Sequence, residues 1–310
     1  MSQKHLLLVL STAVISGFSI FFNSIGVTLA NPSQYTFVKN LIPVFIASSI
    51  LFFPFHTSNF RSLSKKHWVL LVAIGFIGGA VPFVLFFEGL AQAGGGAASF
   101  IHKTLFLWVA IFAPFLLKEK VKLIFFIPAC SLLVANFLLF PFSFHDISRA
   151  HLFIVSATIL WAVEAVISKY VISCEVKPLV VIWSRMTFGS VFLFAYLLLT
   201  DNLPHFTDFS PTVLMWLLIS GTMLTGYVFT WYFGLSRVPV TLASSLLLLG
   251  APITLVLSTL FKGKPITGEN ILGILITVLS VIFLIYLFYH SAKTIGRSSA
   301  TVKTTDPIFQ

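Results

Sequence analysis

Residues 6–29, LLLVLSTAVISGFSIFFNSIGVTL, decide the fold class, because this stretch carries no charged side chain along its whole length. A helix needs about 20 mostly apolar residues to cross the hydrocarbon core of a bilayer. Lys4 precedes the stretch as it would in a signal peptide, but no small-residue cleavage site follows a short apolar core. We therefore expect residues 6–29 to form a first transmembrane helix.

Apolar blocks of similar length recur along the rest of the chain. Hydrophobic residues make up 58% of its 310 positions and charged residues only 9%, whereas soluble domains carry about 25% charged residues. The sequence therefore predicts an all-α integral membrane protein with ten transmembrane helices. The expected spans are residues 6–29, 37–55, 68–90, 95–117, 122–140, 151–173, 178–200, 212–234, 240–261 and 268–290.

The formal net charge of +10 is unevenly distributed between the expected loops. With the N-terminus inside, twelve Lys and Arg residues lie in cytoplasmic segments and three lie outside. Cytoplasmic loops of membrane proteins carry such an excess, so we expect a multi-pass protein of the cell (inner) membrane with both termini cytoplasmic. The basic residues form no run typical of a nucleic-acid-binding arm. The twelve are Lys4, Arg61, Lys65, Lys66, Lys118, Lys120, Lys122, Lys177, Arg237, Lys293, Arg297 and Lys303, and the three are Arg149, Lys262 and Lys264.

The two halves of the chain show a sparse internal similarity. A shift of 145 residues aligns Phe87-Glu88-Gly89-Leu90 with Tyr232-Phe233-Gly234-Leu235, and Ala98-Ser99 with Ala243-Ser244. These matches suggest a duplicated five-helix unit, with repeats at residues 1–145 and 146–292. Since five is odd, the halves must have opposite orientations, an inverted repeat that is typical of transporters. The remaining residues, 293–310, form a polar cytoplasmic tail that we expect to be disordered.

The blocks Phe87–Lys120 and Tyr232–Lys264 resemble the ten-helix EamA branch of the drug/metabolite transporter (DMT) superfamily. The likeness extends over about residues 6–290, and Trp161-Ala162 and Arg185 also fit its second half. One departure is Lys264, which stands where that family has an acid, whereas Glu119 keeps the acid of the first half. The resemblance implies secondary transport of small metabolites through a central cavity between the halves, commonly as export or exchange.

Glu164 and Arg185 are the first candidates for cavity residues. At 1.5 Å per residue they lie roughly 19 Å and roughly 22 Å from the outer ends of their helices, within a hydrocarbon layer of about 30 Å. Embedded charges are costly and usually face a cavity. The short side chain of Glu164 cannot reach the membrane surface, so we expect it to line the cavity or to form a structural ion pair with Arg185. Arg185 could instead extend its guanidinium to the cytoplasmic face.

Three further residues, His102, Lys103 and Lys39, are candidates of a second kind. His102 and Lys103 follow a small-residue run, Gly94–Ser99, that suits close helix packing. Lys103, roughly 13 Å deep, either faces the cavity or reaches the outer surface, and His102 points about 100° away from it. Lys39 is expected near the outer end of its span, where lysines usually extend to the surface.

No enzyme motif, metal-binding constellation or phosphate loop occurs in the sequence, so we expect neither catalysis nor a cofactor. Alternating access of a small metabolite is the predicted mechanism. The alternatives are a non-transporting membrane scaffold and, less favoured, a channel. Cationic residues outnumber acids within the spans, which favours an anionic ligand such as an amino acid or another carboxylated metabolite. The cations are Lys39, Lys103, Lys169 and Arg185, and the acids are Glu88 and Glu164.

Overall fold

The computed structural model describes residues 3–53, 60, 63–118, 124, 126–141, 147–205, 209–263 and 265–303. Within these ranges all regular elements are helices. Eight helical segments among the described residues are long and apolar enough to cross a membrane, and Ile127–Leu139 is a shorter apolar helix. The prediction of an all-helical membrane protein is confirmed. Glu119, Lys120 and Lys264, which mark the turn in each half, lie outside the described residues.

The first half of the chain contains a long, interrupted helical segment. Lys65–Leu117 is continuous over 53 residues, more than twice what one crossing needs, and it includes the expected spans 68–90 and 95–117. At Gly94 the backbone adopts φ 77° and ψ 169°, a conformation that only glycine adopts readily. The elements are α1 (Gln3–Gly26), α2 (Pro32–Phe52), α4 (Lys65–Ile74), the π-helix η1 (Gly75–Ala80), α5 (Val81–Lys103), α6 (Leu105–Leu117) and α7 (Phe126–Leu139).

The second half of the chain begins with three long helices. Pro178 and Pro211 begin two of them, at the helix position where a missing N–H costs nothing. The next segment, Val240–Lys262, is helical throughout but contains a 3-10 turn. The elements are α8 (Arg149–Ser173), α9 (Pro178–Leu199), α10 (Pro211–Leu235), α11 (Val240–Leu246), η5 (Leu247–Leu249), α12 (Gly250–Lys262) and α13 (Gly268–Lys303).

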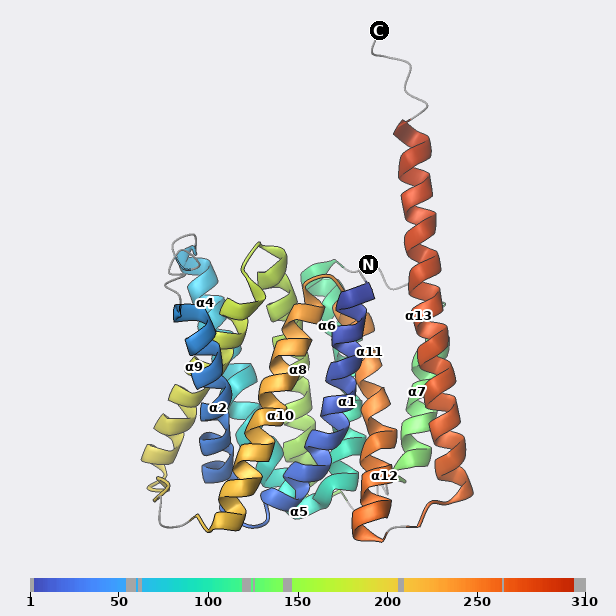
Figure 1. Ribbon diagram of the computed structural model, residues 1–310. Helices are drawn as coiled ribbons and strands as arrows, with labels where there is room; N and C mark the ends of the chain where they lie inside the picture. The colour runs from blue at the N-terminus through green and yellow to red at the C-terminus, as the bar shows by residue number, and fades with distance from the viewer. Residues whose placement is uncertain are drawn as a thin grey trace.

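The last helix, α13, corrects one expectation about the C-terminal tail. The apolar window that could cross a membrane ends at His290, yet the helix continues to Lys303 and projects beyond the bundle (Figure 1). Residues 293–303 thus have a helical conformation where the sequence predicts an irregular tail. Extending an existing helix needs no new nucleus, and no proline occurs between Pro265 and Pro307.

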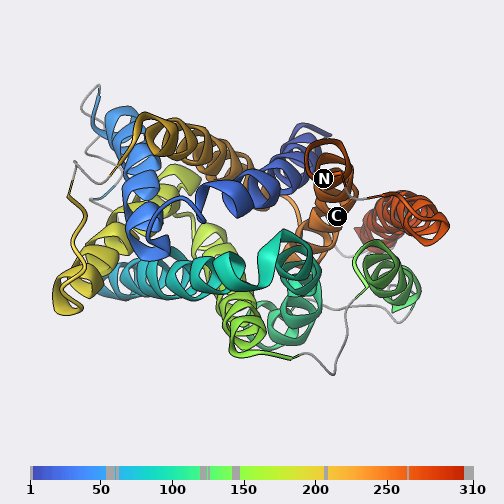
Figure 2. The same cartoon turned by 90° about the horizontal axis from the view of Figure 1, so that it is seen from below.

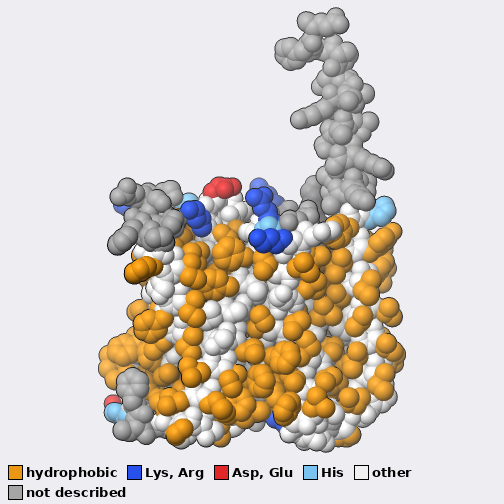
Figure 3. All heavy atoms as spheres, viewed as in Figure 1, with side chains coloured by type: hydrophobic (Ala, Val, Ile, Leu, Met, Phe, Trp, Pro, Cys, Tyr) orange, Lys and Arg blue, Asp and Glu red, His pale blue; other side chains and the backbone are white. Residues whose placement is uncertain are grey.

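Helices of the two halves pack against each other. The helices α1 and α10, α5 and α8, and α2 and α9 form adjacent pairs, and each pair joins the first half to the second. Figure 2 shows these helices grouped around the centre, with α7 and α13 beside each other at one side. In Figure 3 the flank of the bundle is largely hydrophobic, and Lys and Arg gather at the end where α1 begins.

Two glycines let α9 and η1 touch backbone to backbone. A Cβ added at Gly189 of α9 would lie 2.6 Å from backbone atoms of Gly79 in η1. Real Cβ atoms do not approach backbone this closely, and no rotamer change can relieve the contact. This crossing fixes the position of the first turns of α9, including Arg185, relative to η1.

We expect Gly189→Ala to destabilise the protein by about 1–3 kcal/mol, the usual cost of overpacking a filled interior. Gly96→Ala is the matched control, because a Cβ there would meet its nearest neighbour, the ring of Phe140, at an ordinary 3.6 Å. Thermal unfolding in detergent, followed by loss of the monodisperse peak, measures both variants. Equal melting temperatures for Gly189→Ala and the wild type would show that the crossing is not tight.

Candidate functional site

A cavity of about 100 Å³ lies in the middle of the bundle, between the two halves of the chain. Its wall is built by side chains from α1, α2, α5, α6, α8, α9, α10 and η5. A space of this volume is large enough for several water molecules. Four of the five sequence-predicted candidates line it, namely Lys39, His102, Glu164 and Arg185.

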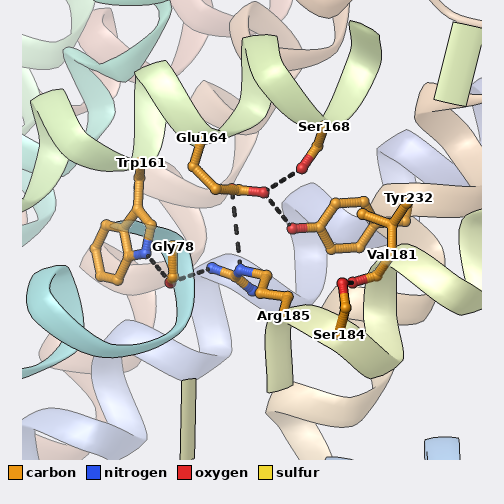
Figure 4. A network of polar contacts seen from close by, with 8 residues as sticks. All are labelled: Gly78, Trp161, Glu164, Ser168, Val181, Ser184, Arg185 and Tyr232. Atoms are coloured by element: carbon orange, nitrogen blue, oxygen red, sulfur yellow. Dashed lines mark hydrogen bonds and ion pairs between the residues drawn. The ribbon is translucent and has the colours of Figure 1, made fainter. Parts of the chain in front are cut away.

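Glu164 and Arg185 face each other across the gap between α8 and α9 (Figure 4). Glu164 Oε2 lies 3.9 Å from Arg185 Nε, and both side chains are buried. The second carboxylate oxygen, Oε1, accepts hydrogen bonds from Ser168 Oγ at 2.5 Å and from Tyr232 Oη at 2.6 Å. A distance of 3.9 Å is too long for a hydrogen bond. The two residues therefore attract each other electrostatically without forming a hydrogen bond. The N–H of Arg185 Nε has no acceptor among the described residues.

The carbonyl of Gly78 holds Arg185 in place from the other side. Arg185 Nη2 donates to Gly78 O at 3.0 Å, and Trp161 Nε1 donates to the same oxygen at 2.9 Å (Figure 4). In an α-helical register this oxygen would accept from the N–H of residue 82, but Pro82 has none. Pro82 thus removes the α-helical donor, and side chains of α8 and α9 donate to this oxygen. Gly78 lies in the π-helix η1, and π-bulges are frequent at functional sites.

Lys39 is a buried cation, and the expectation that it extends to the membrane surface is wrong. It is 1% exposed, and its Nζ lies 4.3 Å from the ring centroid of Phe87 and 4.6 Å from that of Phe83. The physical reason is that α2 begins at Pro32 rather than at residue 37. This places Lys39 about 10 Å into the helix, too far for it to turn back to the surface.

Lys39 also lacks an acidic partner in the part of the chain that the structure describes. Its one hydrogen bond among the described residues goes to Asn40 Oδ1, at 3.2 Å, and no carboxylate of the described residues lies within ion-pair distance. The ring of Phe83 lies between two cations, since Arg185 Cζ is 5.5 Å from its centroid. Aromatic faces attract cations, but they supply no formal negative charge. Lys39 therefore remains available to an anionic ligand.

His102 and Lys103 point in different directions, as their helical spacing predicts. His102 lines the cavity and packs edge-on against Trp161 and Phe86, with ring centroids 5.3 Å and 5.5 Å away. Lys103 is 1% exposed and donates to Ser16 Oγ at 2.8 Å. It is absent from the lining of this cavity, and it does not reach the outer surface either.

Several lining residues were missed by the sequence reasoning or were weighed lightly. Ser19 Oγ and Asn23 Oδ1 line the cavity without a hydrogen-bond partner among the described residues. Tyr232 does not line the cavity but donates a hydrogen bond to Glu164, and the sequence marks it only by its place in the internal repeat. A hydroxyl or amide group inside an apolar span is only weak evidence for a cavity residue, because most such groups form a hydrogen bond within their own helix. Which of them face a cavity depends on helix rotation.

The arrangement suits binding of an anion. The charged groups that line the cavity are Lys39, Arg185 and Glu164, which leaves a net positive charge when all three are ionised. In a poorly solvated space such charges act strongly. Among the described residues no three His, Cys, Asp or Glu side chains gather as metal ligands do.

Comparison with known proteins identifies the family. The model of the EamA-like transporter family matches residues 3–141 and again residues 148–286. A search of curated proteins returned no match. One solved structure, described only as the crystal structure of a protein, has a TM-score of 0.68 at 17% identity, and the alignment covers 89% of this chain and 98% of that one. At this identity the likeness shows the fold alone. The two family matches together cover most of the sequence, so the chain belongs to the EamA-like transporter family of the DMT superfamily and is a multi-pass membrane transporter.

Proposed function

We propose that this protein is a secondary transporter that moves a small anionic metabolite, such as an amino acid or another carboxylated compound, through its central cavity. The observation that carries the proposal is that Lys39 is buried in the cavity wall as a cation and has no acidic partner among the described residues. An uncompensated charge in an apolar interior is costly, and a ligand carboxylate offsets that cost. The unpaired polar atoms of Ser19 and Asn23 offer further contacts.

The proposed mechanism is alternating access between two inverted five-helix repeats, residues 1–145 and 146–292. The long segment Lys65–Leu117 supplies two crossings in this scheme, because Gly94 breaks it and its 53 residues are more than twice one crossing. With α7 counted as a short crossing, the total is ten. The cavity lies between elements of both repeats, which is where rocking of one repeat against the other would open it to either side.

We place the protein in the cell (inner) membrane with both termini in the cytoplasm, and we propose export or exchange as its direction. The gathering of Lys and Arg at the end where α1 begins supports this orientation (Figure 3). A scaffold is the rival from another class, but it gives no reason for burying Lys39, Glu164 and Arg185 around one space. A channel needs a continuous polar path, whereas this cavity is small and its walls are mostly aromatic and aliphatic.

Thermal-shift screening of the detergent-purified protein against a metabolite library identifies the ligand, because a ligand that binds only the folded state raises the melting temperature. Carboxylated compounds should dominate the hits. Uptake of the best compound into proteoliposomes then tests transport itself. Hits confined to cationic or uncharged compounds would contradict the anionic substrate class.

Lys39→Met should lower uptake of the carboxylated ligand about tenfold or more, since hydrogen bonds to charged groups contribute about 1.5–3 kcal/mol. The melting temperature should hold or rise, because the change removes an unpaired buried charge. Lys39→Arg should keep part of the activity. Lys65→Met, at the exposed first residue of α4, is the matched control and should transport normally. Wild-type uptake by Lys39→Met would remove Lys39 from the binding site.

Glu164→Gln and Arg185→Gln should each reduce both transport and expression, because breaking a buried pair leaves a charge alone at a cost of about 3–5 kcal/mol. The double variant should recover expression but not uptake, as expected if the pair contacts substrate. A purely structural pair would recover both when neutralised together. Proteoliposome uptake, normalised to folded protein, distinguishes the two outcomes.

Topology can be tested with single cysteines in a background where Cys130 and Cys174 are replaced by Ser. A cysteine at exposed Lys65 should react only with reagent supplied from the cytoplasmic side. A cysteine at exposed Glu269 should react only from outside, because this residue lies in the first turn of α13, which begins at the opposite end of the bundle (Figure 1). The reverse labelling pattern would invert the proposed orientation.

A further inference from the structure

A second hollow, separate from the central cavity, opens on the flank of the bundle. It has a volume of about 700 Å³ and is lined by residues of η1, α5, α8 and α9. None of its lining residues lines the central cavity. We refer to it as the lateral groove. It lies toward the end where α8 starts, the end from which Figure 2 is seen.

The lateral groove is polar at one end and apolar along its depth. Arg149 is the first residue of α8, and Tyr196 lies in the last turn of α9. One turn further into each helix, Phe153 and Phe192 line the groove, and Phe76 of η1 continues the apolar wall. Phospholipids have the same order of groups, a charged headgroup at the membrane surface and acyl chains below it.

Charges of both signs stand at the polar end. Arg149 is exposed, and its guanidinium carbon lies 5.1 Å from the ring centroid of Phe153. Glu88 is half-buried, and its Oε1 accepts a hydrogen bond from Ser33 Oγ at 3.1 Å. The two side chains line one groove but form no ion pair with each other. A ligand that carries both an anion and a cation would satisfy both.

We propose that the lateral groove binds a phospholipid with a phosphoethanolamine headgroup, which goes beyond the proposed transport function. The phosphate accepts from the Arg149 guanidinium, which suits oxyanions through its planar set of donors. The primary ammonium donates to Glu88, and one acyl chain lies along Phe76, Phe153 and Phe192. A quaternary choline ammonium has no N–H to donate, and a glycerol headgroup has no cation at all, so neither fits the pair of charges.

The lipid would touch the same segment that shapes the transport cavity. Phe76 and Ala80 of η1 line the lateral groove, whereas the carbonyl of Gly78, between them, holds Arg185 and Trp161 on the cavity side. One turn of π-helix thus forms a wall shared by the two spaces. This position gives the site a chemical environment distinct from the general lipid-facing surface.

Native mass spectrometry of the full-length protein, released from detergent after incubation with one lipid at a time, tests the proposal. The probes are phosphatidylethanolamine, phosphatidylcholine and phosphatidylglycerol of identical acyl composition. We expect phosphatidylethanolamine to be retained about tenfold better than the other two, the factor expected for loss of one charge-assisted contact. Arg149→Gln should lower retention of all three lipids, and Glu88→Gln should abolish the preference for phosphatidylethanolamine.

Lys65→Gln and Glu269→Gln are the matched controls, since both residues are exposed and lie outside the groove. They should retain the wild-type preference. Equal retention of the three lipids by the wild type, an unchanged preference in Glu88→Gln, or unchanged retention in Arg149→Gln would overturn the proposal. A lipid-free dimer in the same spectra would do so too, because a second copy of the chain would then cover the groove.

Discussion

The carbonyl of Gly78 is the group on which the centre of this protein depends. Pro82 cannot offer it the backbone N–H of an α-helical register, and the oxygen accepts from Trp161 of α8 and Arg185 of α9. An unpaired carbonyl in a membrane interior costs several kcal/mol, so the side chains that satisfy it are held firmly. Together with the Gly79–Gly189 contact, this small set of interactions ties the two halves of the chain to each other and places a guanidinium in the cavity wall.

Once Arg185 is fixed, the other charges differ in how well they are compensated. The carboxylate of Glu164 lies near the Arg185 guanidinium and accepts hydrogen bonds from Ser168 and Tyr232. These contacts compensate its negative charge. Lys39 has two aromatic faces and one amide oxygen, which is less than an isolated ammonium needs in a medium of low polarity. The difference explains why the proposal of substrate binding rests first on Lys39, with the Glu164–Arg185 pair as a second point of contact. A transporter can use the uncompensated charge of Lys39, because an anionic ligand can pair with this lysine without displacing an existing ion pair.

The π-helix η1 has two faces that serve different surroundings. Its Gly78 carbonyl accepts from Trp161 and Arg185, which line the central cavity, and Phe76 lines the lateral groove on the flank. A π-helical turn widens the helix and disturbs the regular ladder of hydrogen bonds, which makes it a natural place for side chains of neighbouring helices to attach. Membrane lipid on one face and transported ligand on the other would therefore contact a single, locally irregular stretch of backbone.

The amino-acid sequence by itself determined the helical membrane fold, because runs such as residues 6–29 have no other stable arrangement than a helix in a bilayer. The cost of embedded charge also identifies Glu164 and Arg185 as candidates from the sequence alone. The position of Lys39 could not be obtained in this way, since it depends on where α2 begins and on the rotation that turns Nζ toward Phe83 and Phe87. Lys103 illustrates the same limit, because its place beside Ser16 rather than in the cavity follows from how α5 packs against α1. Hydrophobicity reports how deep a residue lies in the membrane, whereas only the packing of one helix on another decides which way its side chain faces.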